Sequence, residues 1–202
     1  MRSGTKKLQM PGGGKLNPEE KYNLAYQNPA YQAPSVGASA LTYVISKLKF
    51  TSVLDVGCGM GYQLIGFLMA KKKVKATEVC DLLLNTYLKP FVVTGIVQKA
   101  RIQQLPFPID TFDLVYCTDV LEHIPECDID EAIKELVRVS KKYIFVTLST
   151  TPAKLCEELK LHETVKPKEW WDEKWNKHRL KKVATDQFRS TSEGAIYVWK
   201  KY

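Results

Sequence analysis

The 202-residue sequence has no run of about eighteen apolar residues, the length that a helix needs to cross a bilayer. Its first segment, Met1 to Lys21, is polar and lacks the apolar stretch of a secretory signal, so we expect no signal peptide. No internal repeat is present, and no segment reads as a linker between two domains. We therefore expect a soluble, cytoplasmic chain with no membrane partner.

Cysteine is scarce and scattered. The chain has no C-x-x-C pair, and its five cysteines lie far apart, at Cys58, Cys80, Cys117, Cys127 and Cys156. A disulfide framework calls for an even number in a short secreted chain, and a structural zinc site calls for closely spaced pairs. The pattern indicates reduced thiols, which fits the cytoplasm.

The net charge of +8 is unevenly distributed. Residues 1–100 carry 13 basic against 5 acidic side chains, whereas residues 101–202 carry 17 of each. This asymmetry points to an anionic partner as one interpretation, with nucleic acid the obvious candidate. A solvated basic surface is the commoner explanation of such an excess.

Short β-rich runs alternate with helical patterns along most of the chain. Near-continuous apolar content, typical of strands buried on both faces of a parallel sheet, marks Ser52–Val56, Val74–Glu78, Ile96–Ile102, Phe112–Thr118 and Tyr143–Leu148. Helical periodicity marks Tyr62–Ala70, Asp81–Leu88, Asp128–Ser140 and a shorter stretch opened by Lys166. The alternation predicts an α/β fold with a doubly wound, mostly parallel sheet. Two last runs, Leu180–Phe188 and Ala195–Lys200, predict a C-terminal antiparallel hairpin.

The two ends of the first fifty residues differ. Residues 1–16 have no hydrophobic period and are expected to form a flexible tail. Asn17-Pro18-Glu19-Glu20 is a typical helix start, with a cap, a proline and two acids. Ser35 to Phe50 predicts a second helix. We expect one domain over residues 17–202, with the helices of residues 17–50 acting as a lid.

A glycine-rich loop, Gly57-Cys58-Gly59-Met60-Gly61, follows the first predicted strand and leads into a helix. Glycines there allow a tight turn and a close approach of the backbone to a ligand. A dinucleotide fingerprint needs a third glycine one residue later, where Tyr62 stands, and a P-loop needs G-K-[ST]. With Asp55 before it, the loop fits a nucleoside ligand without a pyrophosphate. A simple tight turn is the structural alternative.

These motifs and their order resemble the class I S-adenosylmethionine-dependent methyltransferases, from about Val53 to Leu148. The resemblance also includes Val74 to Glu78, which ends a strand in an acid, Leu105-Pro106-Phe107-Pro108, and Asp119-Val120-Leu121-Glu122-His123-Ile124-Pro125. It implies a seven-stranded Rossmann-like sheet, the cofactor S-adenosylmethionine and an enzyme that transfers a methyl group.

The resemblance also implies which residues bind the cofactor. The set is Asp55, Gly57, Cys58, Gly59, Gly61, Glu78, Ile102, Gln103, Thr118 and Asp119. Glu78 would accept both ribose hydroxyls, as carboxylates do about 20 residues after the loop in analogous nucleotide folds. Many relatives read the adenine amine with an acid four residues before Leu-Pro-Phe, where this chain has Arg101, which cannot accept a hydrogen bond. Ile102 could pack on the adenine, and Gln103 or a backbone carbonyl could accept from its amine.

Methyl transfer from a sulfonium is an in-line displacement that depends mainly on positioning. A base is needed only for a poor nucleophile. His123 and Asp119 are the catalytic candidates, because both follow the fourth predicted strand near the expected methyl group. A buried, backbone-bonded His123 that serves as scaffold is the alternative.

A metal site is a further alternative. Asp119, Glu122 and His123 would lie on one helical turn, and some related O-methyltransferases bind a divalent metal through Glu-x-x-Glu-His there. RNA 2′-O-methyltransferases add a downstream histidine, whose counterpart would be His162. Because the shorter Asp119 replaces the first glutamate and no second histidine directly follows His123, we expect no metal ligand.

Tyr22, Tyr26 and Tyr31, together with His162, Trp170 and Trp171, are expected to cover the pocket, with packing in the core as the alternative. We favour a small-molecule acceptor and a monomer. The alternatives are an RNA, DNA or protein methyltransferase and a cofactor-binding regulator without activity. The densest basic cluster, Lys71-Lys72-Lys73 with Lys75, precedes the second strand, so we expect it at the sheet edge opposite the glycine loop.

Overall fold

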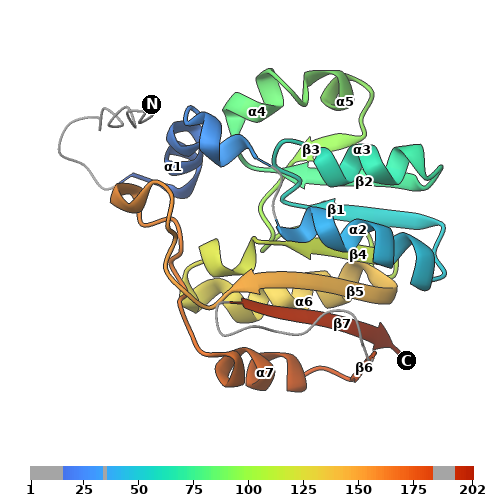
Figure 1. Ribbon diagram of the computed structural model, residues 1–202. Coiled ribbons are helices and arrows are strands. Elements are labelled where there is room, and N and C mark those ends of the chain that lie inside the picture. The colour runs from blue at the N-terminus through green and yellow to red at the C-terminus, as the bar shows by residue number, and fades with distance from the viewer. Residues whose placement is uncertain (1–15, 34–35, 184–193) are drawn as a thin grey trace.

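The computed structural model describes residues 16–33, 36–183 and 194–202, which build one seven-stranded sheet (Figure 1). The strand order is β3-β2-β1-β4-β5-β7-β6. The strands are β1 (Ser52–Val56), β2 (Lys73–Glu78), β3 (Val97–Lys99), β4 (Phe112–Thr118), β5 (Ser140–Ser149), β6 (Leu180–Lys182) and β7 (Gly194–Lys201). β1 to β5 are parallel, and β7 runs antiparallel to both β5 and β6. The predicted α/β class and C-terminal hairpin are confirmed.

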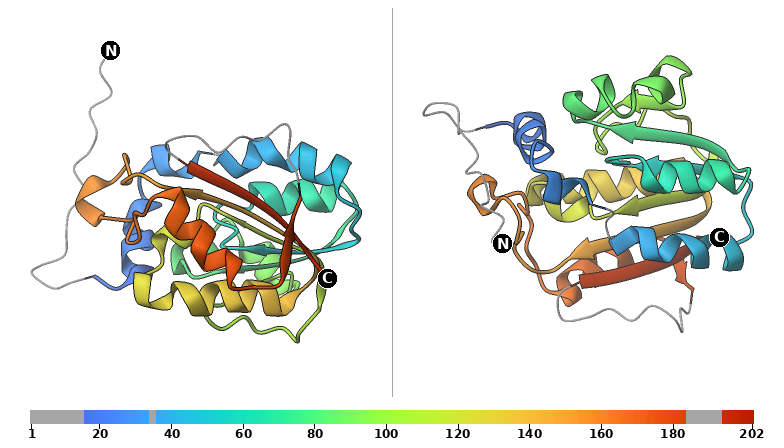
Figure 2. Two further views of the ribbon diagram at one scale, coloured as in Figure 1. Left: turned by 90° about the horizontal axis from the view of Figure 1, so that it is seen from below. Right: turned by 45° about the horizontal axis from the view of Figure 1, so that its top comes forward.

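Helices cover both faces of the sheet (Figure 2). The α-helices are α1 (Pro18–Ala25), α2 (Val36–Lys47), α3 (Tyr62–Met69), α4 (Asp81–Asn85), α5 (Lys89–Val93), α6 (Ile129–Val139) and α7 (Lys168–Asn176). Short 3₁₀ turns are η1 (Pro29–Gln32), η2 (Leu121–His123), η3 (Glu126–Asp128) and η4 (Glu157–Leu159). One core joins α2, α3 and α4 to the sheet, and a second joins α6 and α7 to its other face. This is the doubly wound arrangement.

Successive side chains along a strand point to opposite faces of the sheet and so belong to different cores. In β4, Leu114 and Tyr116 face the α2–α3 side, whereas Val115 and Cys117 face the α6–α7 side. All seven residues of β4 are buried, which explains its continuous apolar run. The buried face of α6 consists of Ile129, Ala132, Ile133, Leu136 and Val139, and Glu135 is buried with them.

Several predicted boundaries were wrong. The third strand is only Val97–Lys99, and Ile102 lies in the turn after it. The predicted helix Asp81–Leu88 ends at Asn85, and α5 was missed because Pro90 reads as a breaker, although proline suits a first helical turn. Ser140 does not close α6 but begins β5, so the helix passes into the strand with no loop.

Other predictions fall on residues outside the described part of the chain. These are the flexible tail, of which residues 1–15 lie outside, and the stretch of the sixth predicted strand and hairpin connection at residues 184–193. The predicted helix start is present: α1 carries a capping box in which Asn17 accepts from the Glu20 amide and the Glu20 carboxylate accepts from the Asn17 amide.

The N-terminal helices α1, η1 and α2 take two different positions on the sheet. α1 and η1 cross the edge of the sheet where β1, β2, β4 and β5 end (Figure 1). Their ties reach both sides of that edge: Lys21 pairs with Glu163 at 2.6 Å, and Asn23 accepts from the Leu82 amide at 2.9 Å. α2 packs on the sheet through Val44 and Leu48. Only α1 and η1 are therefore placed as a cover.

Candidate active site

The glycine loop turns back against the end of β2. The amides of Gly57 and Cys58 both donate to the Thr77 carbonyl, at 2.9 and 3.0 Å. Gly57 and Gly59 have φ values of +68° and +52°, a region that residues with a Cβ rarely adopt. A Cβ on Gly57 would lie 2.6 Å from a Val120 methyl, and one on Gly59 would lie 2.8 Å from the Tyr26 hydroxyl. The loop sequence is thus imposed by backbone shape and by close neighbours.

Glu78 ends β2 with a carboxylate that is only 6% exposed. One oxygen accepts from the Gly59 amide at 2.8 Å, and the other accepts from Val79 and Cys80 at 2.8 and 3.0 Å. Burial raises the pKa of the Glu78 carboxyl, and these three hydrogen bonds oppose the rise. The side chain is therefore fixed beside the loop, and it also lines a cavity there.

Asp55 lies behind the loop and is 2% exposed. Burial, with the nearby Glu78 charge, raises the pKa of the Asp55 carboxyl to about 7, and a hydrogen bond from the Leu64 amide lowers it. Its Oδ2 atom is buried without a hydrogen-bond partner among the described residues. A buried carboxylate oxygen without a partner is costly, so burial favours the protonated form of this side chain.

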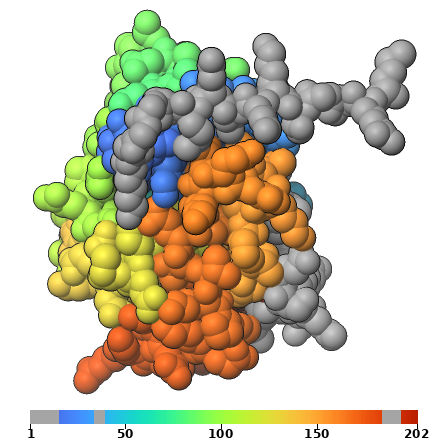
Figure 3. Space-filling view, turned by 90° about the vertical axis from the view of Figure 1, so that its left-hand side faces the viewer, coloured from blue at the N-terminus to red at the C-terminus, as the bar shows by residue number. Residues whose placement is uncertain are grey.

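Two cavities meet at the loop. The smaller, about 340 Å³, lies between the ends of β1 and β2, the turn Ala100–Gln103 and helix α1. The larger, about 720 Å³, extends from the loop to the segment after β5. Both are lined by Tyr26, Tyr31, Gly57, Asp119 and His123. Figure 3 looks onto this edge of the molecule, where α1 and η1, in blue, adjoin the segment after β5, in orange.

Three tyrosines from α1 and η1 cover the junction. Tyr26 contacts Tyr31 edge-on at 5.0 Å between ring centroids, and Tyr22 contacts His123 in the same way at 5.7 Å. Burial raises the pKa of all three phenols, so they stay neutral. They form an aromatic wall with polar tips over the glycine loop.

Arg101, which replaces the acid of many relatives, lies at the far end of the smaller cavity. Its guanidinium pairs with Glu19 of α1 at 3.0 Å, so this position ties the cover to the sheet. The next polar side chain, Gln103, donates through its amide nitrogen to the Asp128 carboxylate at 3.1 Å. Because a carboxylate only accepts, this contact fixes the amide orientation and leaves the Gln103 carbonyl oxygen as an acceptor.

Asp119 sits where the two cavities join. It has φ +56°, uncommon for a residue other than glycine, and its carboxylate accepts from the Thr147 hydroxyl at 2.9 Å. The predicted helical turn over Asp119, Glu122 and His123 is wrong, because only the 3₁₀ turn η2, Leu121–His123, forms and Asp119 precedes it.

His123 is held by its Nδ1 atom, which lies 3.0 Å from the Leu161 carbonyl oxygen. Burial, together with the neighbouring His162, lowers the pKa of the His123 imidazole to about 3, and the hydrogen bond to Leu161 opposes this shift. The ring is thus a neutral imidazole that donates from Nδ1. So low a pKa makes His123 a weak base near neutral pH.

Comparison with known proteins gives this geometry a family. The sequence profile of the family described as "Methyltransferase domain" matches residues 54–145, which span β1 to β5 and carry the glycine loop, Glu78 and Asp119. This segment belongs to the methyltransferase family, and the fold is that of the class I S-adenosylmethionine-dependent methyltransferases.

Individual relatives agree with this family. An uncharacterized protein of Methanocaldococcus jannaschii is 36% identical over 48% of this chain and 40% of its own length. A ubiquinone biosynthesis O-methyltransferase of Xanthomonas euvesicatoria is 29% identical over 56% of this chain and 50% of its own. The chain thus covers half or less of these two curated relatives. The crystal structure of magnesium protoporphyrin IX methyltransferase from Synechocystis, with bound SAH, superposes with a TM-score of 0.62 at 15% identity, covering 82% of this chain and 83% of that one.

The methyltransferase fold brings most of the predicted cofactor residues to the two cavities. Gly57, Glu78, Ile102, Gln103 and Asp119 line the smaller one, and Cys58, Gly59, Thr118 and again Asp119 line the larger one. Asp55 and Gly61 line neither and support the loop from behind. Trp170 and Trp171 do not cover the pocket: Trp171 is fully buried and Trp170 packs against the same core.

Some site residues of the methyltransferase were not predicted. Asp128, which orients Gln103, was assigned only to a helix start, and Glu19, which pairs with Arg101, only to a helix cap. The last residue of β5, Ser149, and the segment after it, which includes Thr151, line the larger cavity without any local motif. No signal within one sequence pairs positions so far apart. Among the described residues, no helix is long and apolar enough to cross a membrane.

Proposed function

We propose that this chain transfers a methyl group from S-adenosylmethionine to a small molecule, with the adenosine in the smaller cavity and the acceptor in the larger. The observation that carries the proposal is the junction of two cavities at the glycine loop, with Glu78 on one side and Asp119 at the join. Such adjacent volumes suit a nucleoside and an acceptor that must meet at one atom.

The charges around the smaller cavity favour a cationic cofactor. Four carboxylates line it, from Glu19, Glu78, Asp119 and Asp128, whereas its one arginine, Arg101, is paired with Glu19. S-adenosylmethionine carries a sulfonium directly attached to its ribose, so a lining rich in carboxylates fits this part of the cofactor.

When bound, the cofactor supplies an electrophilic methyl group: an acceptor lone pair forms the new bond to carbon as the carbon–sulfur bond breaks and its electron pair stays on sulfur. In our proposal the glycine loop and Glu78 fix the ribose and the sulfur position. The three tyrosines exclude water from the junction. Asp119, which faces both cavities, is the better placed of the two predicted catalytic residues to take a proton from the acceptor, because the His123 imidazole is a weak base.

A small-molecule acceptor is supported by two observations. The larger cavity is partly lined by Tyr26 and Tyr31. The names of two similar proteins above refer to ubiquinone biosynthesis and to magnesium protoporphyrin IX, both of which are small molecules. The basic cluster offers little to a nucleic acid, since Lys73 begins β2 at the edge opposite the loop. Lys72 and Lys75 donate there to the carbonyls of Phe50 and Gly95, at 2.9 and 2.6 Å.

The adenine end gives a prediction on selectivity. We expect Gln103→Leu to weaken cofactor binding about tenfold, because the adenine amine loses its acceptor and one such hydrogen bond contributes about 1 kcal/mol. The same variant should bind the inosine analogue, which lacks the amine, no worse than wild type does. Calorimetric titration of wild type and variant with both ligands measures these changes in affinity. Equal tenfold losses for the two ligands would show that Gln103 does not read the amine.

The proposal is tested by a methyl-transfer assay with labelled S-adenosylmethionine. Label should pass to extracts of small metabolites and not to RNA, DNA or protein fractions, and Asp119→Asn should reduce it strongly. Transfer into nucleic acid that weakens steeply with salt would favour the polyanion alternative instead. Tight cofactor binding with no transfer into any fraction would favour a regulatory protein.

A further inference from the structure

An unusual carboxylate lies beside the larger cavity. Glu122, in η2, is 1% exposed, and its Oε1 accepts from the Ser149 amide at 2.8 Å. Its Oε2 is buried and has no hydrogen-bond partner among the residues that the structure describes. Removing an acceptor oxygen from water without a partner is unfavourable, so the arrangement calls for a group that is not a protein donor.

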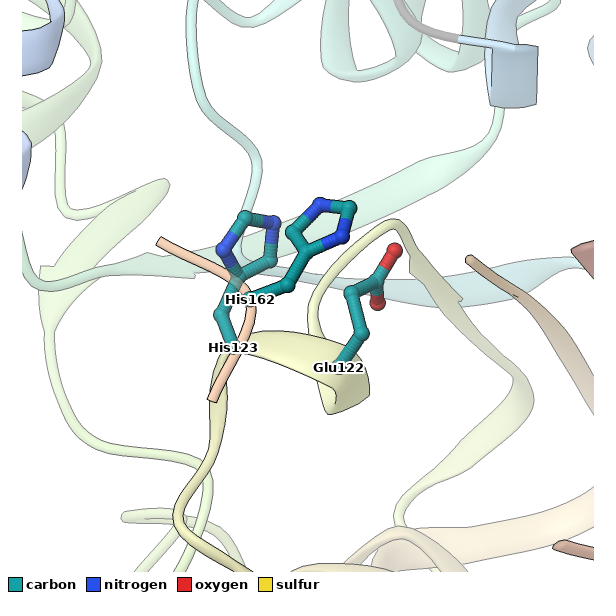
Figure 4. Close-up of side chains that lie close together, drawn as sticks. All are labelled: Glu122, His123 and His162. Atoms are coloured by element: carbon teal, nitrogen blue, oxygen red, sulfur yellow. The ribbon is translucent and has the colours of Figure 1, made fainter. Parts of the chain in front are cut away.

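Two histidines lie beside this carboxylate. One nitrogen of His123, one of His162 and the Glu122 carboxylate oxygen all lie within 4.8 Å of one another. Figure 4 shows the three side chains gathered at one point, with the two imidazoles side by side. The ring centroids of the histidines are 4.8 Å apart.

Each imidazole is oriented by a backbone carbonyl. Nδ1 of His123 lies 3.0 Å from the Leu161 oxygen, and Nδ1 of His162 lies 2.6 Å from the Thr151 oxygen. Since a carbonyl only accepts, both Nδ1 atoms carry the proton and both Nε2 atoms keep a lone pair. Histidines that bind metals are commonly held in this way, by donating the other ring nitrogen to a carbonyl.

The backbone around the cluster is equally fixed. The Glu122 carbonyl accepts from the amides of Glu163 and Thr164, at 2.8 and 3.0 Å. The Thr164 hydroxyl donates to the Ile124 carbonyl at 2.6 Å. The segment that carries His162 is thus docked onto η2, so the three side chains are placed before any ligand arrives.

We propose that Glu122, His123 and His162 bind one divalent transition-metal ion. Three electron-pair donors converge there without a donor hydrogen between them, and a cation satisfies all three. Two imidazoles and one carboxylate favour Zn²⁺, Co²⁺, Mn²⁺ or Fe²⁺ over Mg²⁺, which prefers oxygen ligands. Asp119 is not one of the three, and its carboxylate accepts from Thr147.

The site would leave metal positions open toward the larger cavity, which both histidines line. An oxygen of the acceptor could occupy such a position. This last step rests on the proposed function and implies an acceptor with a hydroxyl or another oxygen ligand. Metal binding itself does not depend on it.

The test is a Co²⁺ titration of the untagged, metal-free chain, followed by visible absorption, with Zn²⁺ as competitor. We expect one ion per chain, displaced by Zn²⁺ and not by equal Mg²⁺, with no near-ultraviolet thiolate band. His162→Gln and Glu122→Gln should each weaken binding at least tenfold. His178→Gln is the matched control, because His178 is the chain's third histidine and lies outside the cluster. It should bind as wild type does.

Absence of stoichiometric Co²⁺ binding would overturn the proposal and leave a proton on Glu122 as the explanation. Unchanged affinity in His162→Gln, or a thiolate band from a cysteine, would also overturn it. If Glu122→Gln fails to fold, the His162→Gln result decides, since that side chain is partly exposed. The titration is done without S-adenosylmethionine, whose binding is measured separately, so failure of the cofactor site is distinguishable from failure of the metal site.

Discussion

Replacing Glu78 with alanine should weaken S-adenosylmethionine binding by about a hundredfold or more. Hydrogen bonds to a charged group contribute about 1.5–3 kcal/mol each, and two ribose hydroxyls would lose their acceptor. The glycine loop would also lose its tie to β2, because the Gly59 amide donates to this carboxylate. Calorimetric titration of the variant measures the loss.

The matched control is Asp81→Asn. Asp81 lies three residues further along, in α4, and its half-exposed carboxylate pairs with Lys99 at 2.8 Å rather than with the loop. Such an exposed pair contributes little, so cofactor affinity should stay within about twofold. Thermal unfolding without ligand shows whether Glu78→Ala is folded. A folded variant with wild-type affinity would remove Glu78 from the ribose site.

Gly57→Ala should destabilise the chain by about 2–4 kcal/mol and abolish cofactor binding. The new methyl would lie 2.6 Å from a Val120 methyl, and the residue would keep a φ of +68°. Relief requires the loop or η2 to move, and both line the site. Chemical denaturation gives the stability, and titration gives the binding.

Gly95 supplies an unusually close control. It has the same φ, +68°, but an added Cβ would meet nothing within 4 Å. Gly95→Ala therefore isolates the backbone cost, about 1–2 kcal/mol, from the steric clash. It should leave cofactor affinity unchanged. Equal effects of the two substitutions on stability and binding would contradict the close packing of the loop against Val120.

Much of the fold could be predicted from the sequence because β1, β2, β4 and β5 are buried on both faces and read as apolar runs. β3 was predicted too long, since it has only three residues. The second half of the predicted strand Leu180–Phe188 lies outside the described part of the chain. Strand ends depend on where neighbours pair, which a single chain does not encode locally. α5 was missed because of Pro90: in a sequence, a proline at a helix start and a proline in a turn look alike.

The candidate site, like the fold, was only partly predictable from the sequence. The glycine loop and Glu78 follow from local spacing, and the structure places both beside the smaller cavity. The partners that give these residues their environment come from distant segments: Tyr26 over Gly59, Asp128 beside Gln103, and His162 beside Glu122. The altered Glu-x-x-Glu-His pattern led us to expect no metal ligand. The geometry supports a different set, in which His162 completes the site and Asp119 is not a ligand.

The most direct test of the cofactor site is a calorimetric titration of the full chain with S-adenosylmethionine. We predict saturable binding at one site per chain, lost in Glu78→Ala and retained in Asp81→Asn. Adenosine or methionine alone should bind far more weakly, because each fills only part of the two joined cavities. No detectable binding of S-adenosylmethionine at high concentration, with the chain shown to be folded, would contradict the account.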